Sequence, residues 1–191
     1  EDPKLKVPVD APDFGLNQLS MRAFNSIFHD LKTMKAGPYR CHYESFLYPL
    51  DAIANWNRLY GAKGFYQYQC VLPPPTAREA TIELLKAIAA SGQGSFLAVL
   101  KDLGPIPAVG LLSFPREGTT LALDFQNQGE KTLRLMSDLD RIVSEAGGRL
   151  YPAKDGRIPA EMFRAGFPNF QLFREHVDPG LSSAFWKRVS A

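Results

Sequence analysis

Eight residues in the first half of the chain alternate in character and constrain the fold more than any other stretch. In "FYQYQCVL" (65–72), a pleated strand would send successive side chains to opposite faces. One face then carries Tyr66, Tyr68, Cys70 and Leu72, and the other carries Phe65, Gln67, Gln69 and Val71. The first face needs a covering layer, whereas the second, partly polar face can remain open to a ligand or to solvent.

The segments that follow this strand alternate between helical and strand patterns. Thr76 and Glu79 form a capping-box pattern at the start of a helix, and Gly92 is placed to end it. Three strand patterns and a second amphipathic helix then follow, in the order 95–104, 119–127, 130–148 (the helix) and 149–155. The order β-α-β-β-α-β predicts an α+β fold of the ferredoxin-like type, an antiparallel sheet with both helices on one face.

The segments on either side of this unit are less regular. Residues 1–15 lack periodicity and predict an extended arm, and apolar residues at steps of three and four after Leu16 predict an N-terminal helix. The aromatic stretch 41–50 predicts a strand that Pro49 interrupts. Residues 156–191 predict a C-terminal helical tail, whose many aromatic residues should pack against the unit or against another domain.

Composition limits the function classes. The 22 basic and 20 acidic side chains give a net charge of +2, which offers no reason to expect nucleic acid as a partner. No apolar run approaches the ~20 residues that a membrane-spanning helix needs. Cys41 and Cys70 have no metal-ligand spacing and predict two reduced, mostly buried thiols. His29, His42 and His176 are far apart in sequence, so we expect no metal site.

Two groups of residues are candidates for chemistry. Gln67 and Gln69 share one strand face, where two amides can hydrogen-bond neighbouring hydroxyls or simply form a half-exposed polar surface. Lys154 stands at the end of the last predicted strand, close to Tyr151 and Asp155. Its ammonium could hold a phosphate, stabilise an anion formed during a reaction, or be an ordinary surface charge. The residue pattern alone leaves these alternatives open.

Several motifs together resemble a known family. "WNRLYG" (56–61), "GFYQYQ" (64–69) and "GGRLYPAKD" (147–155) occur in the order seen in the FAD-linked oxidoreductases of the vanillyl-alcohol oxidase superfamily. The resemblance extends from about Leu16 to the C-terminus. It implies that residues 1–150 are a substrate (cap) domain that lacks its N-terminal part. It also implies that residues 151–191 return to an FAD-binding domain absent from this chain, with the aromatic tail as the surface that meets it.

The resemblance also assigns roles to individual residues. Lys154 matches a lysine beside the flavin and substrate, and Tyr151 matches a residue near the flavin ring. Gln67 and Gln69 match a pair that lines the substrate pocket. Three further pocket positions differ from the nearest branch of the family, with Leu47 in place of a tyrosine, and Thr120 and Ala122 in place of an asparagine and a cysteine. These differences put the substrate of that branch in doubt.

The function that the resemblance implies is oxidation of a secondary alcohol on a sugar-like or sugar-lactone substrate, with FAD as hydride acceptor. The expected partners are a small sugar-like substrate and the absent FAD-binding domain, and the isolated chain should be inactive. We expect a cytoplasmic location, with peripheral membrane association of the intact protein as the alternative. A different class also stays open, because a ferredoxin-like unit can be a non-catalytic ligand-binding or protein-interaction module.

Overall fold

The computed structural model describes residues 5–12, 18–34, 37–48, 50–95, 97–154 and 156–191. Its centre is a four-stranded antiparallel sheet with the strand order β4-β5-β3-β6. The strands are β3 (Phe65–Leu72), β4 (Ala98–Leu103), β5 (Gly118–Gln126) and β6 (Arg149–Leu150). Strands and helices occur together around one sheet, so the predicted α+β class is confirmed.

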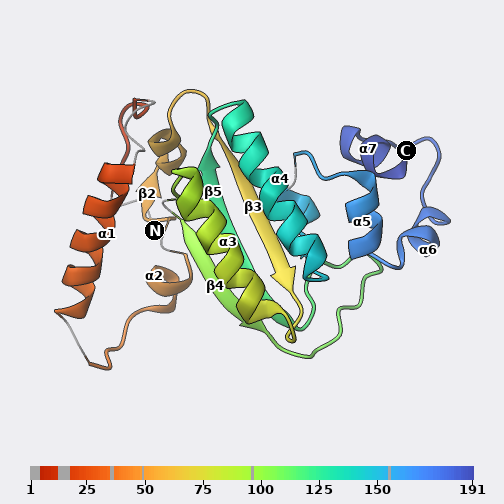
Figure 1. The fold of residues 1–191 in the computed structure, drawn as a ribbon, viewed down its shortest axis with the longest axis horizontal. Coiled ribbons are helices and arrows are strands. Elements are labelled where there is room, and N and C mark those ends of the chain that lie inside the picture. The colour runs from red at the N-terminus through yellow and green to blue at the C-terminus, as the bar shows by residue number, and fades with distance from the viewer. Residues whose placement is uncertain (1–4, 13–17, 35–36, 49, 96, 155) are drawn as a thin grey trace.

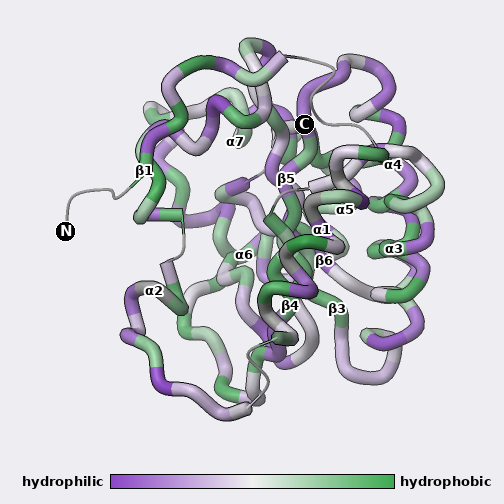
Figure 2. The backbone as a smooth tube through the Cα atoms, turned by 90° about the vertical axis from the view of Figure 1, so that its left-hand side faces the viewer, coloured by the Kyte–Doolittle hydropathy of each residue, from purple (hydrophilic) through white to green (hydrophobic). Residues whose placement is uncertain are grey.

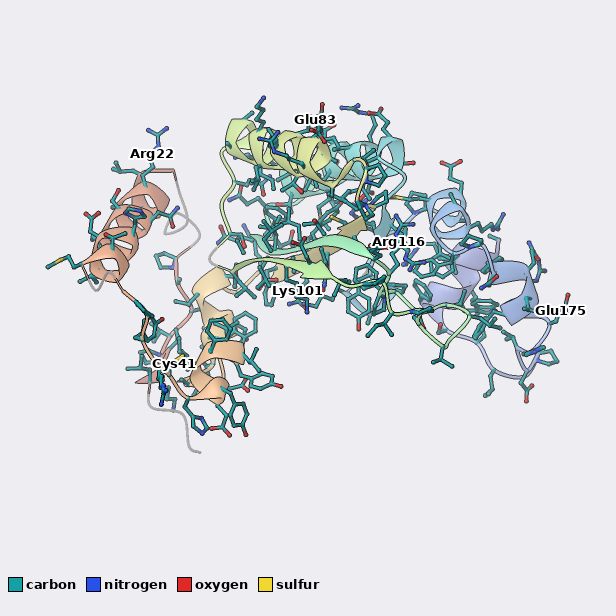
Figure 3. The ribbon with its side chains drawn as sticks, turned by 90° about the horizontal axis from the view of Figure 1, so that it is seen from below. Arg22, Cys41, Glu83, Lys101, Arg116 and Glu175 are labelled. Carbon is teal, nitrogen blue, oxygen red and sulfur yellow. The ribbon has the colours of Figure 1, made fainter. Side chains whose placement is uncertain are left out.

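Two long helices complete the central unit. They are α3 (Ala77–Ser91), between β3 and β4, and α4 (Glu130–Glu145), between β5 and β6. The element order from β3 to β6 is therefore the β-α-β-β-α-β order expected from the sequence. Both helices lie side by side over the same face of the sheet, and the opposite face is seen from below (Figures 1 and 3). This arrangement leaves the glutamine-bearing face of β3 without cover from α3 and α4.

The hydrophobic core lies between the sheet and the two helices. Its largest contributions come from alternate residues of β3 and β5 and from one stripe of each helix, namely Tyr68, Cys70, Leu72, Leu121, Leu123, Phe125, Leu84, Leu135, Leu139 and Val143. Along α3 and α4, hydrophobic and hydrophilic residues alternate in the pattern of amphipathic helices (Figure 2). Burying such stripes contributes roughly 1.5–3 kcal/mol for each large side chain, so this interface dominates the stability of the fold.

Of the two caps that the sequence predicted for α3, the structure has only the C-terminal one. Gly92 adopts the left-handed conformation expected of a C-terminal cap, with φ of 70°. Thr76 is the N-cap residue, but its hydroxyl makes no capping hydrogen bond. Instead it donates to the carbonyl oxygen of Ala146 (2.8 Å) at the end of α4. The predicted capping box is therefore wrong, because the Thr76 backbone lies in the helical region (φ −113°, ψ −6°) and not in the extended conformation of a capping residue.

The N-terminal part contains a helix where a strand was predicted. The helix α1 (Gln18–Thr33) forms as expected, but the aromatic stretch 41–50 contains α2 (Tyr43–Leu47). A strand needs a neighbour to bond its backbone, whereas this helical turn satisfies itself locally, with Tyr48 N–H donating to Glu44 O (2.8 Å). Cys41 precedes this turn and is exposed, so the expectation that both thiols are mostly buried holds only for Cys70.

Several short elements were not predicted. The arm contributes β1 (Leu5–Lys6), which pairs in parallel with β2 (Ile53–Ala54), and a 3-10 turn η1 (Trp56–Tyr60) follows. The last strand is shorter than the expected 149–155, because β6 ends at Leu150 and the 3-10 turn η2 (Pro152–Lys154) begins. Pro152 has no N–H to donate to a ladder, which explains why pairing stops there.

The C-terminal tail packs against the central unit. It forms α5 (Ala160–Gly166), α6 (Phe170–Arg174) and α7 (Ala184–Ser190), at the end of the molecule opposite α1 (Figure 1). Phe163, Phe167 and Phe170 are at most 2% exposed and belong to the same buried cluster as the sheet. These three rings are covered within this chain, which is one of the two placements that the sequence left open for the tail.

A search of the described residues finds no helix that combines the length and the apolar character needed to cross a bilayer.

Candidate functional site

The open face of the sheet carries the two candidate glutamines. In the register of β3 and β5, Gln67 lies opposite Asp124 and Gln69 lies opposite Ala122. The side-chain Nε2 of Gln67 donates to Oδ1 of Asp124 (3.2 Å), and Nε2 of Gln69 donates to the hydroxyl of Thr120 (3.1 Å). Both amides are thus held at their nitrogen, which leaves their carbonyl oxygens available to accept a hydrogen bond.

Asp124 is the buried carboxyl group of this face. Its residue surface is 1% exposed, and Tyr60 donates a second hydrogen bond to Oδ2 (3.4 Å). Burial raises the pKa of this carboxyl above its ordinary value, while the Gln67 hydrogen bond, the Lys154 charge and the Tyr60 hydroxyl act in the opposite direction. Lys154 and Gln67 line the same depression, so the lysine lies near this part of the sheet.

The segment that carries Tyr151 and Lys154 is fixed to the edge of β3. Tyr151 N–H donates to the carbonyl oxygen of Gln69 (2.8 Å), and Lys154 N–H donates back to Tyr151 O (3.1 Å). The Tyr151 ring stacks on Phe114, with ring centroids 4.6 Å apart. A continued strand would have carried Lys154 further along the sheet edge. The 3-10 turn instead returns it toward Gln67 and Gln69.

An ion pair connects the next part of this segment to α4. Arg157 Nη1 lies 2.7 Å from Oδ2 of Asp140, and the two side chains are 18% and 10% exposed. Both groups are mostly removed from water, so each needs the other for its charge to be tolerated. The hydroxyl of Tyr68 is also buried here, and burial, followed by the Asp140 charge, raises its pKa well above the ordinary value. The pair therefore links the lysine-bearing segment to the rigid core.

A small depression beside the edge of β3 brings four of the predicted residues together. It is lined by Gln67, Tyr68, Gln69, Met136, Leu150, Tyr151, Lys154 and Arg157. Thr120 and Ala122 lie next to it on β5, on the face that they share with the glutamines. Leu47, at the end of α2, does not line this depression and is 58% exposed. The structure thus groups six of the seven predicted site residues and leaves Leu47 apart.

Three residues of this region were not indicated by the sequence. Asp124 and Lys101 could have been found from the alternation of β5 and β4, but only once the strand register was known, since Lys101 lies opposite Thr120. Figure 3 shows Lys101 on the side of the sheet away from α3 and α4. Arg157 comes three positions after Lys154, and no sequence pattern connects it to Asp140, because the two residues come from different parts of the chain.

Other parts of the described chain offer less. A hollow of about 630 Å³ between α3 and the edge strand β4 contains no predicted site residue. Within the described residues, no group of three or more His, Cys, Asp or Glu side chains could hold a metal ion. The Cys70 thiol is buried, which raises its pKa to about 12 and makes it a poor nucleophile. The depression at β3 therefore remains the best candidate site.

The fold and this site define an α+β module with a polar sheet face next to a lysine and a stacked tyrosine. No family model matches the sequence. The chain is 38% identical over 174 residues to decaprenylphosphoryl-beta-D-ribose oxidase of Mycolicibacterium smegmatis. The matched region covers 88% of this chain and 37% of that protein. The chain is also 28% identical over 183 residues to an uncharacterized protein of Streptomyces coelicolor, covering 94% of this chain and 48% of that protein.

These comparisons support the resemblance to an oxidase that the sequence motifs indicated. The matched region includes nearly the whole chain, yet the chain spans less than half the length of each of these two relatives. Similarity over this part alone does not extend to the remainder of the relatives.

Proposed function

We propose that the intact protein is an FAD-dependent oxidoreductase that oxidises a secondary alcohol of a sugar-like or sugar-lactone substrate. The observation that carries this proposal is the convergence of Gln67, Gln69, Tyr151 and Lys154 at one depression. The similarity to a relative named as a ribose oxidase supports the same reading. We further propose that residues 1–150 are part of a substrate domain and that residues 151–191 return to a separate FAD-binding domain.

The residues at the depression suit a flavin cofactor. A bound flavin would supply the hydride acceptor, and a nearby cation and a flat aromatic side chain would favour its binding and reduction. Lys154 supplies the cation, and Tyr151 supplies a ring that Phe114 supports from one side. Most of the cofactor would be held by the part of the protein outside this chain, and we expect the isolated chain to be colourless and inactive.

Gln67 and Gln69 are proposed to position the substrate. Their amide nitrogens already donate to Asp124 and Thr120, so their carbonyl oxygens can accept hydrogen bonds from neighbouring hydroxyls of a sugar. Holding the substrate this way reduces the entropic cost of reaching the reactive geometry. Ala122, which lies opposite Gln69 on β5, is small and leaves room at this point of the face.

Lys154 is proposed to act by its charge. A fixed ammonium stabilises the negative charge that develops on the reduced ring, whereas a general base would need a neutral amine. The test uses the intact flavoprotein and follows substrate-driven bleaching of the flavin absorption. Lys154→Met should slow reduction by about 10²-fold, and Lys154→Arg, which keeps a charge but cannot accept a proton, should retain most of the rate. An unchanged rate in Lys154→Met excludes both roles.

The alternative, a non-catalytic module, makes a different prediction for the intact gene product. An absorption spectrum distinguishes the two classes, because an oxidoreductase of this kind carries the flavin bands. An intact product that binds no flavin after reconstitution with FAD would overturn the proposed function.

A further inference from the structure

Two arginines meet outside the proposed active site. Arg116 lies in the loop that precedes β5, and Arg149 begins β6. Both line a hollow of about 350 Å³ between the 105–117 loop and the start of α6, together with Ser113, Glu117 and Asn169. Figure 3 shows Arg116 at the base of this loop, close to the C-terminal helices.

The protein holds each guanidinium with carbonyl oxygens. Arg149 donates to Phe114 O (3.0 Å), Gly166 O (3.2 Å) and Pro115 O (3.3 Å). Arg116 donates from Nη2 to Gly147 O. The buried Nε of Arg116 has no acceptor in the described part of the structure. The carbonyls fix the orientation of the two forks, but neutral acceptors do not balance two positive charges.

The local charge is therefore unbalanced. Within the described residues, no carboxylate oxygen lies within 4.0 Å of either guanidinium, although the exposed Glu117 lines the same hollow. Burial lowers the pKa of both arginines, and the charge of Arg116 lowers the pKa of Arg149 further, to about 10. Both groups remain charged at neutral pH, so the repulsion persists unless an anion enters.

We propose that this hollow is a binding site for a phosphate-type oxyanion. A tetrahedral oxyanion has several oxygen atoms that can each accept a hydrogen bond. Two arginines offer several directed N–H donors to these oxygens, whereas a lysine offers a single compact charge. Ser113 accepts a hydrogen bond from Gly110 N–H at its oxygen, so its own proton is free to be donated. The side chain of Asn169 does not cap α6 and can supply a further N–H.

The position of the hollow connects it with the candidate site. Arg149 lies two residues before Tyr151, and Phe114, whose carbonyl accepts from Arg149, stacks on the Tyr151 ring. An oxyanion bound here would lie beside the depression that holds Lys154. The inference itself does not depend on the flavin chemistry and can be tested on this chain alone.

The test is a titration with inorganic phosphate at constant ionic strength, followed by isothermal calorimetry and by the side-chain Nε–H signals of arginine in NMR spectra. We expect saturable binding that shifts the Arg116 and Arg149 signals. Arg116→Gln should weaken binding about tenfold or more, because it removes a charge-assisted donor. Arg141→Gln, on the exposed surface of α4 next to Glu145, is the matched control and should bind like the parent.

Arg149→Gln removes three tertiary hydrogen bonds and could fail to fold, so Arg116→Lys provides the second variant. It keeps the charge but loses the fork, and we expect affinity between those of the parent and Arg116→Gln. The proposal is overturned if phosphate shows no saturable binding, if Arg116→Gln binds as tightly as the parent, or if Arg141→Gln loses affinity to the same extent.

Discussion

At the scale of single residues, Asp124 is a carboxyl group on the glutamine-bearing face that is only 1% exposed. Its pKa is raised by burial, so the folded state holds the proton of this carboxyl more tightly than the unfolded chain does. The contribution of Asp124 to stability is therefore greatest below the ordinary pKa of 3.8 and is lost as pH rises through the raised value.

Asp124→Asn should remove this dependence. We expect the stability of the variant, relative to the parent, to improve as pH rises from about 4 toward neutrality, because the parent alone must ionise a buried carboxyl. Urea unfolding at a series of pH values measures the difference, and Asp138→Asn on the exposed side of α4 is the matched control. If the stability of Asp124→Asn relative to the parent falls as pH rises, then Gln67, Lys154 and Tyr60 together lower the pKa of Asp124 by more than burial raises it.

The two cysteines should differ sharply in reactivity. Cys41 is exposed, whereas Cys70 is fully buried with its pKa raised to about 12, so almost none of it is thiolate at neutral pH. In the native protein, a thiol reagent should label one equivalent rapidly and the second only after unfolding. Cys41→Ser should abolish the rapid phase, and rapid labelling that survives in Cys41→Ser would contradict the buried position of Cys70.

At the scale of elements, the approach of β5 to the end of β3 depends on one glycine. Gly118 has φ of +140°, and a Cβ atom there would lie 2.0 Å from the carbonyl oxygen of Leu72. Gly118→Ala should therefore lower the free energy of unfolding by at least about 2 kcal/mol. Gly129→Ala is the matched control, because its φ of +62° is also positive but nothing lies within 4 Å.

The control separates conformational strain from steric overlap. Gly129→Ala should cost about 1–2 kcal/mol from strain alone, so the excess in Gly118→Ala reports the contact with Leu72. Denaturant unfolding of both variants gives the comparison. Equal losses of unfolding free energy in the two variants would mean that the backbone at Leu72 shifts to accommodate the Cβ atom without an energetic cost.

The elements themselves were predicted unevenly from the sequence. The alternation of residues 65–72 and the periodicity of 130–145 identify β3 and α4 because each pattern is long and local. The prediction of a strand over 41–50 was wrong, because aromatic residues favour strands only where a neighbouring strand is available. Likewise, Thr76 has capping chemistry, but its backbone is helical and its hydroxyl is oriented to donate to the carbonyl oxygen of Ala146.

The candidate site shows the same division. Gln67, Gln69, Tyr151 and Lys154 could be selected from sequence motifs, and the structure brings them together. Asp124, Lys101 and the Arg157–Asp140 pair depend on strand register and on packing between elements, which no local pattern encodes. Leu47 was also selected from its position in the sequence, but it does not line the depression that the other predicted residues share.

At the scale of the whole molecule, stability should be distributed unequally between the two ends. The sheet, α3, α4 and the C-terminal rings share one buried cluster. The helix α1, at the opposite end (Figure 1), presents apolar side chains to solvent, with Leu19, Ile27 and Leu31 each at least 60% exposed. A 16-residue helix is only marginally stable in water when packing does not support it.

Amide hydrogen exchange followed by mass spectrometry tests this distribution on the present chain. We expect the amides of α1 to exchange long before those of β3 and β5, since Leu19, Ile27 and Leu31 of α1 are already exposed, whereas opening of the sheet requires global unfolding. Ile27→Ala should leave global stability within about 0.5 kcal/mol of the parent, whereas Leu139→Ala in the core should cost about 2–5 kcal/mol. Protection of α1 equal to that of β3 would show instead that this helix is part of the same cooperative unit.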